Sequence, residues 1–151
     1  MKKVIGIILC AIISCLCLIS CNEKSKTNDY KLTDIAEIGN YVNELSENKE
    51  TIVINSDDTL VMSDFDSKAL FDFYSQSLND LSISEEDFAE KISSPMNITV
   101  KKGDIDGTYK LLVSIIQNDN DGSGWGMTMT YNEQDKSIYF KKNTYSLKSG
   151  D

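Results

Sequence analysis

The stretch 108-TYKLLVSIIQNDNDGSGWGMTMTY-131 decides the fold, because apolar and polar residues alternate on both sides of a turn-forming segment. An alternation with a period of two is typical of strands with one buried face. Residues 118–124 between the two runs are rich in Asn, Asp and Gly, which favour chain reversal. We therefore predict antiparallel strands over 108–117 and 125–131. Their shared buried face consists of Tyr109, Leu111, Val113, Ile115, Trp125, Met127, Met129 and Tyr131.

The same period extends to both neighbours of this hairpin. After Pro95 the apolar period changes from 3.6 to 2, which predicts a strand over 96–101, and residues 137–142 predict another. The connections over 102–107 and 132–136 are short and rich in turn residues. Short connections between successive strands predict an antiparallel meander.

The first half of the chain has a helical period. Apolar residues recur at steps of three and four over 30–48, which predicts an amphipathic helix there, although Gly39 weakens it. A second helix is predicted from the N-cap candidates at 63–66 to Leu81, with a buried stripe of Leu70, Phe73, Tyr74, Leu78 and Leu81. Ser84 begins a third, short helix that buries Phe88 and Ile92.

Two short strands are predicted between the first two helices, over 51–55 and 59–62. The whole pattern predicts an α+β fold, with N-terminal helices packed on one face of an antiparallel, mostly meander sheet. This arrangement loosely resembles cystatin-like and NTF2-like folds. The resemblance implies a pocket between helix and sheet.

The N-terminus has the pattern of an export signal. Lys2 and Lys3 precede the uncharged, mostly apolar run 4–20. The residues Leu18, Ile19, Ser20 and Cys21 that end this run resemble the lipobox of bacterial lipoproteins. The resemblance implies cleavage before Cys21 and lipidation of that cysteine, hence a chain exported and lipid-anchored to a bacterial membrane. An uncleaved N-terminal anchor is the alternative.

The predicted organisation is a lipoprotein signal peptide at 1–20, a lipidated cysteine and flexible tether at 21–29, a single α+β domain at 30–148 and a tail at 149–151. All four cysteines lie within the first 21 residues, so the domain has no disulfide. The domain must therefore be stabilised by its core.

Composition excludes several function classes. The chain has no histidine and no arginine, which rules out a Ser-His-Asp triad and an imidazole-bound zinc. The formal net charge is −9, and an acidic surface repels nucleic acid. We therefore predict no enzyme activity, no catalytic residues and no nucleic-acid partner.

Two D-x-D-G segments carry the carboxylates Asp104, Asp106, Asp119 and Asp121. Acidic loops with a glycine supply oxygen ligands for calcium, but Asp-Gly also favours hairpin turns. An EF-hand is excluded, because its first and twelfth positions would be Gln117 and Thr128. We predict solvated turns and no cofactor, with a calcium site as the alternative.

Two further groups of side chains are candidates for function. Asp57, Asp58, Asp64 and Asp66 suit turns and helix caps, or a carboxylate pair for hydrolysis. On the outer sheet face, the candidate surface for a protein partner or ligand consists of Leu112, Ile116, Tyr139 and Tyr145.

These observations predict a membrane-anchored envelope lipoprotein whose acidic domain is a non-catalytic binding or interaction module. Its partners are the membrane, through the lipid on Cys21, and an envelope protein or small ligand. The alternatives are a carboxylate-based envelope hydrolase, or a structural spacer lipoprotein with a calcium loop.

Overall fold

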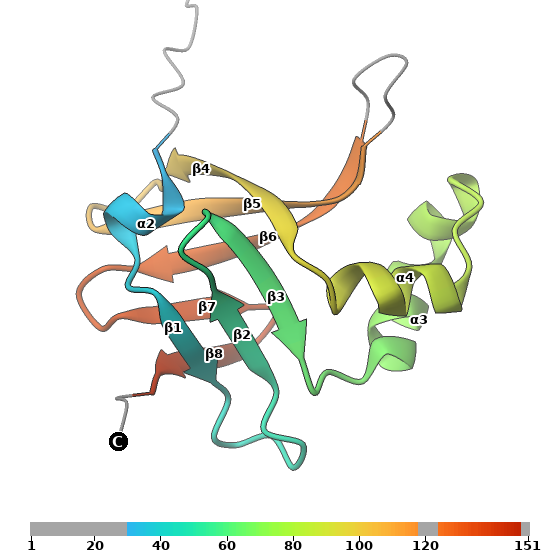
Figure 1. The fold of residues 1–151 in the computed structure, drawn as a ribbon, viewed down its shortest axis with the longest axis horizontal. Coiled ribbons are helices and arrows are strands. Elements are labelled where there is room, and N and C mark those ends of the chain that lie inside the picture. The colour runs from blue at the N-terminus through green and yellow to red at the C-terminus, as the bar shows by residue number, and fades with distance from the viewer. Residues whose placement is uncertain (1–29, 118–123, 149–151) are drawn as a thin grey trace, which may run out of the picture.

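A computed structural model describes residues 30–117 and 124–148, and within them eight strands form a closed antiparallel barrel (Figure 1). Each strand pairs with the next in sequence, and β8 returns to pair with β1. The strands are β1 (Gly39–Val42), β2 (Thr51–Ile54), β3 (Thr59–Ser63), β4 (Met96–Lys102), β5 (Thr108–Gln117), β6 (Gly124–Asn132), β7 (Ser137–Phe140) and β8 (Asn143–Leu147). The helices in this part of the chain are α2 (Leu32–Ile35), α3 (Ser67–Asp80) and α4 (Glu85–Ile92).

The predicted α+β fold, with helices packed on one face of a sheet, is therefore wrong. The largest error is the helix predicted over 30–48, where the chain forms the short α2 and then β1. Gly39 starts β1 with φ 151°, and β1 pairs with both β2 and β8. Pairing with segments distant in sequence overrides a local apolar period that also suits a helix.

The barrel is closed by two short seams. At the first, β1 meets β8 through the pairs Tyr41–Leu147 and Val42–Ser146. At the second, β3 meets β4 only through Thr59–Asn97 and Leu60–Met96. Because closure removes the free sheet edges, these few pairs determine the architecture.

The segment before β1 reinforces the second seam. Tyr30 forms an isolated bridge with Val100 on β4. The backbone N–H and hydroxyl of Thr33 donate to Asp58 Oδ1, at 2.9 and 2.7 Å, in the β2–β3 turn. These hydrogen bonds lower the pKa of Asp58. Residues 30–36 thus connect the β2–β3 turn to β4.

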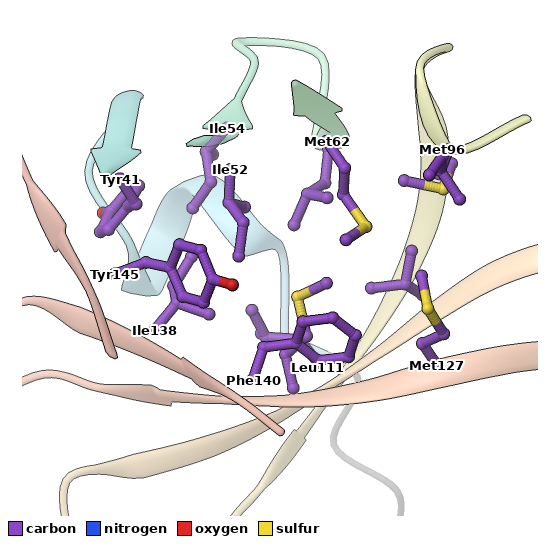
Figure 2. Packing of buried hydrophobic residues seen from close by; sticks show 14 of the residues in the cluster. Tyr41, Ile52, Ile54, Met62, Met96, Leu111, Met127, Ile138, Phe140 and Tyr145 are labelled. Atoms are coloured by element: carbon purple, nitrogen blue, oxygen red, sulfur yellow. The ribbon is translucent and has the colours of Figure 1, made fainter. Parts of the chain in front are cut away.

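Side chains fill the barrel interior (Figure 2). Every strand contributes inward residues to one continuous apolar cluster. Its largest fully buried side chains include Tyr41, Tyr131, Tyr145, Phe88 and Phe140. An eight-strand barrel is just wide enough to be filled in this way.

Helices α3 and α4 link β3 to β4 and lie together outside the barrel (Figure 1). As predicted, they begin at side-chain caps: Asp66 accepts from the Ala69 N–H at 2.9 Å, and Ser84 accepts from the Asp87 N–H at 3.1 Å. Among the described residues, no helix has the length and apolar character needed to cross a membrane.

The β5–β6 hairpin confirms the strands predicted from the opening stretch. Six of the eight residues predicted on its buried face are buried, and Tyr109 and Trp125 are partly buried. Most of this face lines the barrel interior, whereas the sequence placed all of it beneath helices. Trp125, at one end of the face, does contact Tyr74 of α3 and Phe88 of α4. The register shifts between Ser114 and Ile116, where β5 carries a bulge.

Gly126 lies beside this bulge, and a Cβ atom there would be 2.1 Å from the Val113 carbonyl oxygen. We expect Gly126→Ala to lower the free energy of unfolding by about 1–3 kcal/mol, because backbone must move to accept the methyl group. Urea unfolding measures this change. The control is Gly107→Asn, since Gly107 has φ 77° with no atom near its missing Cβ, and asparagine tolerates that conformation. Equal stability of Gly126→Ala and wild type would contradict the close approach of β5 and β6.

Candidate functional site

The candidate site is a hollow of about 610 Å³ between α3 and the turn that joins β7 to β8. Its volume is within the range of about 300–1,000 Å³ that is typical of small-molecule sites. We call it the α3 groove, and it is lined by Phe73, Tyr74, Thr128, Phe140, Lys141, Lys142 and Asn143.

The helix α3 presents two adjacent aromatic rings to this groove. Leu70 and Leu78 are the buried residues of α3, and Tyr74, one turn from each, is partly buried. Phe73 is displaced from that stripe, and 63% of its surface is exposed. The prediction that Phe73 and Leu81 belong to the buried stripe is therefore wrong, since Leu81 is also exposed.

A chain of aromatic contacts leads from the groove into the core. The ring centroids of Phe73 and Tyr74 are 4.8 Å apart, and those of Tyr74 and Trp125 are 5.1 Å apart, both edge to face. Trp125 in turn lies 6.4 Å from Phe88, which is fully buried. Trp125 is the only tryptophan in the sequence. It does not line the groove itself but contacts Tyr74, which does.

Two lysines form the opposite side of the groove. Lys141 Nζ lies 3.9 Å from the centroid of the Phe73 ring, a cation–π contact. Lys141 and Lys142 form the two-residue turn between Phe140 and Asn143, which pair across the hairpin. In the part of the chain that the structure describes, the five ion pairs use other lysines.

A smaller hollow of about 90 Å³ lies on the other side of Phe140 and Lys141. Tyr145 Oη donates to Glu50 Oε2 at 2.9 Å, and Asn43 Nδ2 donates to the same oxygen at 3.4 Å. Burial raises the pKa of Tyr145, and the hydrogen bond to Glu50 raises it further. The neutral phenol is therefore the form that fits this site.

The four acidic residues proposed as turns, caps or a carboxylate pair are divided between the two ends of β3. Asp57 accepts from Thr59 in the β2–β3 turn, and Asp58 accepts from Thr33. Asp66 caps α3, and Asp64 is exposed in the connection before it. Asp57 therefore stabilises a turn, Asp58 makes a tertiary contact, and Asp66 caps a helix.

The first D-x-D-G segment forms the turn between β4 and β5. Asp104 pairs with Lys110 at 2.7 Å and Asp106 pairs with Lys102 at 3.3 Å, with both carboxylates largely exposed. Asp119 and Asp121 lie outside the described residues. Within residues 30–117 and 124–148, no cluster of three or more potential metal ligands occurs.

The predicted partner surface is not a single patch. Leu112 and Ile116 lie partly buried along a hollow over Gly126, on the outer side of β5 and β6. Tyr139 is 38% exposed, and its hydroxyl donates to Asp135 at 2.6 Å. Tyr145 points into the barrel interior (Figure 2). It was placed on the outer face because β8, whose inward face carries it, was not predicted from the sequence. The assignment of Tyr145 to an outer surface is corrected accordingly.

The α3 groove was not predicted from the sequence. Residues 137–142 were predicted as one strand, whereas the chain turns at Lys141 and Lys142 and returns as β8. Two-residue hairpin turns favour Asn-Gly or Asp-Gly, and a Lys-Lys pair gives no such signal. The lipobox residues Leu18, Ile19, Ser20 and Cys21 lie outside the described residues.

Comparison with known proteins identifies no relative: no family model, curated protein or solved structure matches the chain.

The Tyr145–Glu50 contact generates a prediction about alkaline pH. Because the pKa of Tyr145 is raised in the folded protein, its contribution to stability is present below the ordinary tyrosine pKa of about 10 and is lost as pH rises through the raised value. We expect the free energy of unfolding to fall above pH about 10, and to fall less steeply in Tyr145→Phe. Urea titrations between pH 8 and 11 measure the slopes. Tyr139→Phe, on the outer face, is the control. Identical slopes for wild type and Tyr145→Phe would contradict this role.

Proposed function

We propose that this chain is an exported, lipid-anchored envelope protein whose barrel is a non-catalytic binding module, with its ligand site in the α3 groove. The supporting observation is Phe73, an aromatic ring 63% exposed on the wall of a groove of about 610 Å³. An exposed apolar group at a concave surface is a feature of ligand sites.

The lining of the groove favours binding over hydrolysis. It consists of aromatic rings, two lysines, a threonine and an asparagine. Carboxylate-based hydrolysis needs an acid and a base on either side of the substrate, and this lining offers neither. The barrel interior is filled by its own side chains, so the space for a ligand lies outside it.

The anchor is proposed from the sequence alone. The lipobox-like residues 18–21 follow a basic start and an apolar run, and 22–29 supply a polar tether before the first described residue. All described strands and the core cluster lie between Tyr30 and Lys148, so protein that starts at Asn22 retains them.

Lipidation is tested with Cys21→Ser in a bacterial host supplied with radioactive palmitate. We expect wild-type protein to be labelled and to sediment with membranes, and Cys21→Ser to be unlabelled, because the thiol is the acceptor. Cys17→Ser, within the apolar run, should be labelled like wild type. An unlabelled wild-type chain that still sediments with membranes would instead indicate an uncleaved anchor.

Binding is tested with N-phenyl-1-naphthylamine, a neutral dye whose fluorescence rises in apolar surroundings, on residues 22–151. We expect saturable binding that quenches or shifts Trp125 fluorescence, because Tyr74 contacts both the groove and Trp125. Phe73→Ser should weaken binding by about tenfold, or about 1.4 kcal/mol, through the loss of an aromatic contact.

The matched control is Ile105→Ser, which removes another exposed apolar side chain, 72% exposed, in the β4–β5 turn. It should bind the dye like wild type. Unchanged affinity in Phe73→Ser, or equal losses in both variants, would refute the α3 groove as the ligand site.

A further inference from the structure

The residues that line the α3 groove also indicate the charge of its ligand. We propose that it binds a flat apolar molecule, such as an aromatic ring system, that bears one anionic group held by Lys141 and Lys142. This inference rests on the proposed function, because it names the ligand class for the same groove.

Two lysines bring positive charge to the lining of the groove. Lys141 Nζ lies over the Phe73 ring, so a positive charge is held at the apolar wall. Lys142 lines the same groove. A ligand whose ring packs in the groove beside Phe73 and Tyr74 would therefore place an attached carboxylate or sulfonate near the Lys141 ammonium group, with Lys142 on the same groove lining.

The backbone of the β7–β8 turn is strained at Lys141. Lys141 has φ 57°, a left-handed conformation that costs a residue other than glycine or asparagine free energy. Asparagine or glycine would form this turn with less strain. Lys49 and Lys136 share this positive φ, and their ammonium groups form ion pairs with carboxylates. The ammonium group of Lys141 instead lies on the Phe73 ring at the groove.

The two lysines of the groove contrast with the acidic character of the rest of the chain. The formal net charge is −9, so the average surface repels an anion. A neutral ligand would not use the two lysines, and a cationic ligand would be repelled by them. If an anion binds more tightly than its neutral analogue, the responsible positive charge must therefore lie at the binding site itself.

The test compares two dyes that share one ring system. N-phenyl-1-naphthylamine is neutral, and 8-anilino-1-naphthalenesulfonate is the same skeleton with a sulfonate. With residues 22–151 at low ionic strength, we expect the sulfonate dye to bind about fivefold more tightly, since two partly exposed charge contacts each contribute modestly. Added salt should reduce this preference.

The variants assign the preference to the two lysines. Lys141→Gln combined with Lys142→Gln should abolish the preference for the sulfonate dye, so that this variant binds the two dyes with equal affinity. Lys141→Asn should reduce the preference for the sulfonate dye. It should also raise the midpoint of thermal unfolding, because asparagine adopts the positive φ of this turn with less strain than lysine. Lys148→Gln, at the far end of β8, should behave like wild type.

The outcomes separate this inference from the proposed function. If the neutral dye binds through Phe73 but the sulfonate dye binds no more tightly, the groove is a ligand site and its anionic specificity is wrong. The same holds if the preference persists in the double lysine variant. If the binding of neither dye depends on Phe73, both proposals fail together.

Discussion

The pairing of β1 with β8 is the contact on which the rest of the structure depends. It joins the two ends of an eight-strand meander through the pairs Tyr41–Leu147 and Val42–Ser146, and without it both strands would be free edges. No cysteine follows Cys21, so hydrogen bonding and packing alone maintain closure. The inward side chains make this possible, because Tyr41 and Tyr145, on the two closing strands, are buried in the same core.

A filled interior determines where a ligand site can form. Aromatic and aliphatic side chains occupy the barrel, and the helical insertion between β3 and β4 lies outside it (Figure 1). β7 pairs with β6 only over Thr130–Asn132, so α3 and the β7–β8 turn lie beside the part of β6 that β7 does not cover. The α3 groove is thus a consequence of unequal strand lengths.

The sequence predicted the elements whose periodicity is strong and local. The strands of the β5–β6 hairpin, the caps at Asp66 and Ser84 and the exposed turn at 103–107 follow from residues close together in the chain. Barrel closure could not be predicted from such local residues, because it depends on pairs of residues more than a hundred positions apart. The groove was missed because it depends on a contact between Phe73 and Lys141, which are distant in sequence, and on a Lys-Lys turn that the sequence did not predict.

The β7–β8 turn shows how a stability cost can indicate function. Several other residues also have positive φ, among them Asp58, whose carboxylate accepts two hydrogen bonds from Thr33. That contact compensates for strain within the fold itself. Lys141 has no comparable anchor: its ammonium group rests on an exposed ring, and that cation–π contact is of the order of 0.5–1 kcal/mol at an exposed site. Lys49 and Lys136 also have positive φ, and their ammonium groups pair with Glu44 and Glu37. What distinguishes Lys141 is therefore the position of its ammonium group at an aromatic wall in an acidic protein, and the proposed anionic ligand is based on that position.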